Sequence, residues 1–161
     1  MEIINGERLV LGTCYYPEHW DESLWRDDLR RMLENGIEVI RIAEFAWSKI
    51  ERYEGVFNYD FFDRFLDVAA DMGMKVIFCT PTATPPAWLT EKYPEVLNAN
   101  MDGVLYRHGG RRHYNYNSPK YQELTRIIVE KSASHYAKHP AIIGWQIDNE
   151  INCEKNEFYS E

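Results

Sequence analysis

Cysteine is scarce in this sequence of 161 residues. The three cysteines, Cys14, Cys79 and Cys153, are far apart, and no CxxC pair is present. An odd and scattered set argues against a disulfide framework and against a thiolate metal site. The sequence also has no apolar run near the roughly 20 residues that a membrane span needs, and its first residues do not resemble a signal peptide. We therefore expect a cytoplasmic protein with no membrane partner.

Basic charge is in short supply as well. Lys and Arg total 18 against 26 Asp and Glu, the net charge is −8, and the one dense basic patch covers residues 107–113. Phosphate backbones are bound by clustered Lys and Arg, so nucleic acid is not an expected partner. Aromatic residues, in contrast, make up 14% of the chain. They indicate a well-filled core or apolar faces that stack on sugar rings, and composition leaves both readings open.

Short apolar runs alternate with amphipathic segments along the chain. Asp21 is a candidate helix N-cap and Gly36 a candidate stop for the first amphipathic segment. The pattern predicts strands at 9–16, 38–45, 75–80 and 142–147, and helices at 22–35, 59–72 and 118–139. It predicts loops at 47–58, at 81–89 with a short helix at its end, and at 94–117. A loop as long as the last one tends to be functional.

The predicted order is β-α-β-α-β-α-β. Near-continuous apolar strands are typical of a parallel sheet that is covered on both faces. A doubly wound sheet and a TIM barrel both have this order. The first βα junction, residues 15–20, has no glycine-rich phosphate cradle, which argues against a dinucleotide fold. The prediction is therefore an α/β protein with the first four units of a (β/α)8 TIM barrel.

In a TIM barrel the site lies at the carboxyl ends of the strands. The residues that follow the four apolar runs are polar or aromatic: Tyr15, Tyr16, Glu18 and His19; Arg41, Glu44 and Trp47; Thr80, Thr82, Thr84 and Trp88; and Asp148, Asn149 and Glu150. Carboxylates transfer protons, amides and hydroxyls bind sugar hydroxyls, and Trp stacks on rings. This set favours a neutral polyol ligand.

Glu150 is the predicted proton-donating acid and Asn149 its sugar-binding neighbour. The alternative is that Glu150 merely opens the next helix. An ion pair between Arg41 and Glu44 would explain both residues without a ligand, and Asp148 either supports the site or does nothing.

The remaining candidates are aromatic or basic. Trp47 and Trp88 are either core residues or sugar platforms. Arg111 and Arg112 are expected to be a solvated pair, and only the place of Arg111 in the long loop makes it a candidate.

Five motifs, in order, resemble glycoside hydrolase family 42, the β-galactosidases. They are CYYPEHW at 14–20, RIAEFAW at 41–47, TPTATPP at 80–86, GRRHY at 110–114 and DNE at 148–150. The resemblance implies a TIM barrel and retaining hydrolysis of terminal β-D-galactosides. It implies that Glu150 is the acid/base, that Asn149 binds the 2-hydroxyl of the sugar and that Arg111 binds galactose. Trimers occur in the family, so a homo-oligomer is one expectation.

Two departures from the family pattern matter. Three positions that align with zinc-binding cysteines of some members are Asn115, Tyr159 and Glu161, so we expect no structural zinc and no cofactor. The second departure is length, because a barrel typically needs about 250 residues. Residues 1–161 are therefore expected to be the N-terminal half of the catalytic barrel, with the nucleophilic Glu beyond them. A non-catalytic carbohydrate-binding half-barrel and a self-associating fragment with open sheet edges are the alternatives.

Overall fold

The computed structural model describes residues 9–151 and 158–160. They form two compact units: unit 1 contains 9–43, 59–79 and 136–147, and unit 2 contains 44–58, 80–135, 148–151 and 158–160. Within these described residues, no helix is long and apolar enough to cross a bilayer.

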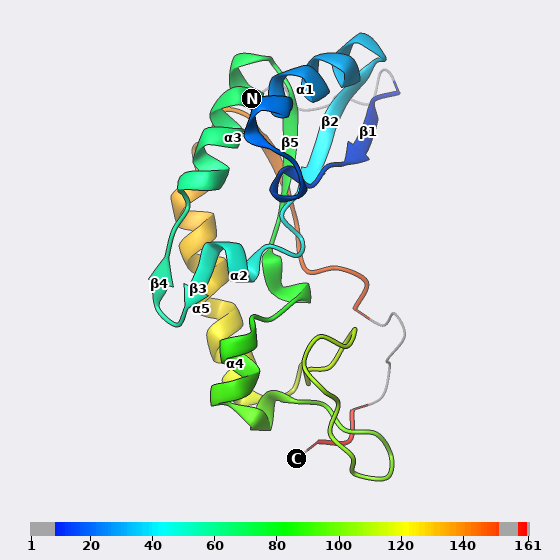
Figure 1. The fold of residues 1–161 in the computed structure, drawn as a ribbon, viewed down its shortest axis with the longest axis vertical. Coiled ribbons are helices and arrows are strands. Elements are labelled where there is room, and N and C mark those ends of the chain that lie inside the picture. Colours follow the sequence, from blue (N-terminus) through cyan, green and yellow to red (C-terminus); the bar gives the residue numbers. More distant parts are fainter. Residues whose placement is uncertain (1–8, 152–157, 161) are drawn as a thin grey trace. The chain divides into compact units, whose positions relative to one another are not determined.

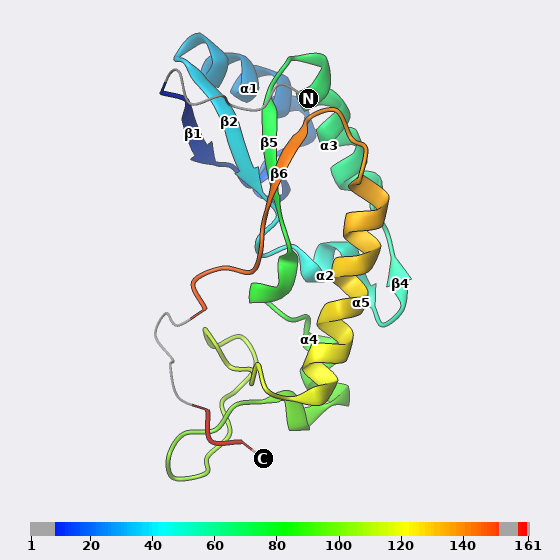
Figure 2. The ribbon, with the colours of Figure 1, turned by 180° about the vertical axis from the view of Figure 1, so that it is seen from behind.

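Unit 1 is built on a four-stranded sheet (Figures 1 and 2). The strands are β1 (Leu11–Cys14), β2 (Ile37–Ile42), β5 (Lys75–Cys79) and β6 (Ile142–Gln146), in the order β1-β2-β5-β6. Every neighbouring pair is parallel, which confirms the predicted parallel α/β arrangement. The strands are shorter than predicted. The second one ends at Ile42 because Ala43 has a left-handed backbone, with φ of 74°.

Two helices cover one face of this sheet. They are α1 (Trp25–Glu34) and α3 (Asp60–Asp71), and Figures 1 and 2 show both on the same side. Alternate strand residues point toward them, as the two-residue period of a strand requires. The fully buried side chains of this layer include Leu29, Ile40, Ile42, Phe62, Phe65, Leu66, Ala69, Val76 and Phe78. Asp21 accepts a hydrogen bond from the Ser23 amide at 2.9 Å, so it caps a short 3-10 turn at Glu22–Leu24 that leads into α1.

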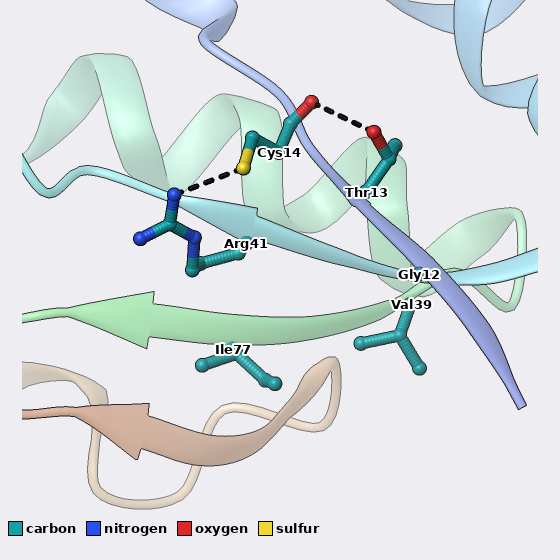
Figure 3. Close-up of a pocket in the computed structure, with 6 residues that line it drawn as sticks. All are labelled: Gly12, Thr13, Cys14, Val39, Arg41 and Ile77. Atoms are coloured by element: carbon teal, nitrogen blue, oxygen red, sulfur yellow. Dashed lines mark hydrogen bonds between the residues drawn. The ribbon is translucent and has the colours of Figure 1, made fainter.

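The opposite face of the sheet is open, so the prediction of cover on both faces is wrong for the described residues. Every residue of β1 is exposed. A cleft of about 240 Å³ lies on this face, lined by Gly12, Thr13, Cys14, Val39, Arg41 and Ile77 (Figure 3). Arg41 lies across it and donates to Gln146 Oε1 at 2.8 Å and to Cys14 Sγ at 2.9 Å. The apolar runs on β1 and β6 are those of edge strands rather than of fully enclosed ones.

Unit 2 begins with a helical turn and a hairpin where the sequence predicted only a loop. The elements are α2 (Trp47–Ile50), β3 (Glu51–Tyr53) and β4 (Val56–Phe57). The turn at Gly55, with φ of 77°, is the one that the sequence indicated. The Glu51 carboxylate accepts hydrogen bonds from Trp47 Nε1 and the Gly55 amide, both at 2.8 Å. These tertiary contacts stabilise strands that are too short to show a periodic pattern.

The rest of unit 2 is mostly irregular, as predicted. It contains α4 (Ala87–Lys92), 3-10 turns at Pro81–Ala83 and Pro94–Val96, and the long helix α5 (Pro119–Tyr136) up to His135. In the 94–117 segment, isolated bridges join Leu97 to Tyr114 and Ala99 to Leu105. Asn98 is fully buried there, and its backbone carbonyl accepts from the Tyr106 amide at 2.8 Å. Backbone pairing therefore orders a loop that has no regular element of its own.

Candidate functional site

The predicted acid lies in a short tip, residues 148–150, that follows β6 with only Ile147 between. Asp148 and Glu150 both have left-handed backbones, with φ of 55° and 47°. For residues other than glycine this conformation costs on the order of 1–3 kcal/mol and persists only where the surroundings enforce it. The contacts of Asp148 and Glu150 within unit 2 are therefore the central feature of the site. Glu150 itself is not helical, and the alternative that it opens the next helix concerns residues that lie outside the described part of the chain.

Asp148 is held by two threonines from the segment after β5. Its backbone N–H donates to Thr80 Oγ1 at 2.7 Å, and Thr82 Oγ1 donates to its Oδ2 at 2.8 Å. Its Oδ1 accepts from the Asn149 amide at 2.6 Å. The sequence left the role of Asp148 open between support and none. These contacts favour support, because both carboxylate oxygens and the amide anchor the tip.

Arg112 is buried, so the prediction of a solvated arginine pair is wrong for this residue. Its side chain is 2% exposed, and its Nη1 lies 3.5 Å from Asp148 Oδ1. Nη1 also donates to Tyr114 Oη at 2.7 Å and to Tyr116 Oη. Burial lowers the pKa of Arg112, but the oxygens of Tyr114, Tyr116 and Asp148 outweigh it and leave the pKa above its ordinary value. Arg112 is therefore a buried cation beside the Asp148 carboxylate.

Arg111 and Glu150 form an ion pair through Nη2 and Oε2. Their side chains are 41% and 53% exposed. A pair this exposed contributes about 0.2–1 kcal/mol to stability, so it orients the two groups rather than holding the fold together. A polar ligand can compete for either group at little cost.

A group of tyrosines underlies the tip. Tyr114 and Tyr121 are buried and stack with their ring centroids 4.8 Å apart. Tyr114 donates to the Ala83 carbonyl at 3.1 Å, and Tyr121 donates to the Thr82 carbonyl at 2.8 Å. Burial raises the pKa of both hydroxyls, which keeps them neutral donors. They fix the backbone that presents the Thr82 hydroxyl to Asp148.

The two tryptophans among the other predicted site residues both donate hydrogen bonds to Glu51. Trp47 is fully buried, which favours packing over a sugar platform. Trp88 is half-buried and donates to the Glu51 carbonyl at 3.0 Å. Glu44 is fully buried in unit 2. Arg41 and the polar residues after the first strand belong to unit 1.

Two of the three positions that align with zinc-binding cysteines lie in the described part of the chain, and both make hydrogen bonds. Asn115 Nδ2 donates to Ser160 Oγ at 2.6 Å, and the Tyr159 amide donates to Asn98 Oδ1 at 3.3 Å. Glu161 lies outside the described residues. No group of three His, Cys, Asp or Glu side chains is placed to hold a metal ion in the part of the chain that is described. The expectation of no zinc remains a prediction.

Arg112, Tyr114 and Tyr116 were not predicted as part of the site. Each lies in the irregular 94–117 segment, where no periodicity separates buried from exposed positions. The GRRHY motif contains Arg112 and Tyr114 but assigned them no role, and the alternation of aromatic residues at 114 and 116 cannot be distinguished from core packing by composition alone.

The site thus points to a class of protein: a parallel α/β fold in which a carboxyl and an amide follow a strand and an arginine from a separate loop pairs with the carboxyl, groups that carbohydrate-active enzymes use. A family model described as beta-galactosidase matches residues 14–161. The chain therefore belongs to this family, glycoside hydrolase family 42.

Individual relatives agree. The chain is 43% identical over 145 residues to beta-galactosidase Bga of Halorubrum lacusprofundi, covering 90% of this chain and 21% of that protein. It is 46% identical over 144 residues to beta-galactosidase BgaA of a Thermus species, covering 89% of this chain and 22% of that protein. The crystal structure of a beta-galactosidase from the psychrophilic Marinomonas ef1 superposes with a TM-score of 0.91 at 42% identity, covering 95% of this chain and 24% of that one. The chain spans less than a quarter of the length of these relatives.

Proposed function

We propose that residues 1–161 are the N-terminal part of the catalytic barrel of a retaining β-galactosidase, with Glu150 as its acid/base. The tip at 148–150 carries the proposal, because three separate contacts to Asp148 hold an unfavourable backbone that presents Asn149 and Glu150. The open face of the sheet, and outer edges on β1 and β6 that have no strand partner within the described residues, support a barrel completed by further strands.

The chemistry follows from the two-carboxylate scheme of retaining glycosidases. Glu150 protonates the departing glycosidic oxygen and then, as a base, activates water. The attack on the anomeric carbon needs a second carboxylate about 5–5.5 Å away. We propose that this group comes from a part of the protein outside residues 1–161. Asp148 is a poor candidate, since Thr82 and the neighbouring amide already occupy both of its oxygens.

Sugar recognition is assigned to the two polar neighbours of the acid. The Asn149 amide can donate to and accept from the 2-hydroxyl, and the Arg111 guanidinium can donate to other hydroxyls of galactose. In the structure Arg111 contacts Glu150. A galactoside that binds Arg111 would therefore draw it away from the acid.

The test is hydrolysis of a chromogenic β-galactoside by this chain and by the complete protein that contains it. We expect activity only in the complete protein, and a loss of about 10²–10⁴-fold in Glu150→Gln, the range that general acid–base catalysis supplies. Glu130→Gln, at a side chain on α5 that is 63% exposed, is the matched control and should leave activity unchanged. Full activity in Glu150→Gln would refute the assignment. Galactose binding by this chain, without turnover even in the complete protein, would favour a carbohydrate-binding module.

A further inference from the structure

The Arg112 guanidinium has more buried donors than partners. Its Nη1 is fully engaged, but its Nε and Nη2 are buried and have no hydrogen-bond partner among the described residues. Burying a cation with unpaired donors costs stability, and an apolar residue of similar size is often better tolerated. A buried polar group of this kind calls for a specific reason. The stability of unit 2 alone does not supply one.

The surroundings of Arg112 point to the 148–150 tip. The Tyr116 ring lies under the guanidinium, with 5.7 Å between Cζ and the ring centroid, and the Tyr114 and Tyr116 hydroxyls hold Nη1. Among the residues that the structure describes, Arg112 pairs with the carboxylate of Asp148, which is 12% exposed. The tyrosines thus hold the cation in a fixed place beside Asp148.

Arg111 and Arg112 contact alternate residues of the same tip. Arg111 pairs with Glu150, and Arg112, itself left-handed with φ of 57°, lies against Asp148. The exposed pair is weak and replaceable. The buried pair of Arg112 and Asp148 is screened little by solvent. Thr82 holds the Asp148 carboxylate through its other oxygen. The orientation of the tip therefore depends on Arg112 more than on Arg111.

We propose that Arg112 is a positioning residue for the acid/base: it holds the Asp148 carboxylate, and through the backbone of residues 148–150 it fixes the direction of the Glu150 carboxyl. This inference rests on the proposed function of Glu150. Arg112 itself touches no substrate in this account. Arg112 affects the reaction by setting how accurately the Glu150 carboxyl is placed against the glycosidic oxygen. Small misplacements of a catalytic group lower the rate on the order of 10²-fold.

The first arm of the test uses the 161-residue chain. Amide hydrogen exchange is measured by NMR at Asp148, whose N–H donates to Thr80, in the wild type, Arg112→Met and Arg112→Lys. We expect exchange to accelerate about tenfold or more in Arg112→Met and less in Arg112→Lys, which keeps the charge but loses the planar fork. Arg126→Met, at an exposed position on α5, is the control and should leave the rate unchanged. An unchanged rate in Arg112→Met overturns the proposal.

The second arm uses the complete protein and two substrates with different leaving groups. Methyl β-galactoside needs a proton from the acid for its alcohol to leave, whereas dinitrophenyl β-galactoside releases a phenolate without one. We expect kcat/KM of Arg112→Met to fall about 10²-fold for the first substrate and only slightly for the second. Loss of folded protein would lower both equally, so equal losses overturn the positioning role.

Two further results are possible: the variant does not fold, or the complete protein is inactive. If Arg112→Met does not fold by circular dichroism, Asp148→Asn removes the same charge pair from the other side and should produce the same substrate-dependent loss. An equal loss on both substrates would again refute the role. If the complete wild-type protein hydrolyses neither galactoside, the proposed function fails, while the exchange measurement still decides whether Arg112 holds Asp148.

Discussion

Thr82→Val is the sharpest perturbation of the tip that leaves its shape intact. Valine has nearly the size of threonine, so the substitution removes the hydroxyl without opening a cavity. Thr82 is buried, and its Oγ1 donates to Asp148 Oδ2 at 2.8 Å. A hydrogen bond to a charged group contributes about 1.5–3 kcal/mol. We expect a loss of that size in the free energy of opening the tip.

Thr80→Val tests the second contact in the same way. It removes the acceptor of the part-buried Asp148 amide, a 2.7 Å bond, and leaving such a donor without a partner costs about 1–3 kcal/mol. Both threonines act on one residue. Once one substitution has opened the tip, the second has less left to break. The double variant should therefore lose less free energy of tip opening than the sum of the two single losses.

The assay is amide exchange at Asp148 and Asn149, with urea unfolding as the global measure. Since 1.4 kcal/mol corresponds to a factor of ten, Thr82→Val should raise the exchange rates by about 10–100-fold. Thr13→Val, at an exposed residue of β1 with only a long 3.4 Å contact to the Cys14 carbonyl, is the control and should change stability by less than about 0.5 kcal/mol. If Thr82→Val matches that control, the tip is held by its backbone alone and the account of Asp148 as an anchor is wrong.

Three further predictions concern unit 2. Burial lowers the pKa of His113 below its ordinary value of 6.5. As the pH falls below about 6.5, the unfolded chain therefore binds a proton at His113 before the folded chain does, which destabilises the fold. The urea concentration at the unfolding midpoint should decrease as the pH is lowered from about 7 to about 5. His113→Gln should flatten this dependence, and an unchanged slope would contradict the reasoning. Glu51→Ala strands the buried Trp47 Nε1 donor and should lose about 1–3 kcal/mol in urea unfolding, whereas a loss near zero would show that the hairpin does not need the contact. Glu150→Gln removes only an exposed pair with Arg111 and should shift the unfolding free energy of this chain by less than about 1 kcal/mol, so a large loss in thermal melts would mean that Glu150 is structural.

The regular elements were predictable where their periodicity is long. The apolar stripe of the segment that forms α3 runs over three turns, and the runs that form β2 and β5 are buried in the sheet. The hairpin at 51–57 was missed because strands of two and three residues are too short for any pattern to emerge. Its stability comes from the contacts of Glu51 with Trp47 and Gly55, which are tertiary.

The same division applies to the site. Local sequence pointed to Glu150 and Asn149, because polar residues that end an apolar strand are delivered to one end of a parallel sheet. It could not show that Arg112 is buried while Arg111 is exposed. Adjacent residues of an irregular loop have no periodic rule for burial, and one of these two is exposed while the other is enclosed by tyrosines.

The sequence by itself determined the order of the four sheet strands and of the long helices between them, the parallel α/β class and the family, because apolar periodicity and short motifs are local properties of the chain. Only the tertiary structure decided how the acid is held. The Asp148 carboxylate meets Thr82 from 66 residues away in the chain, and its neighbour Arg112 is buried by side chains that no local pattern relates to it. Contacts over such separations depend on the packing of the whole unit, and that packing is what turns an unfavourable backbone into a stable tip.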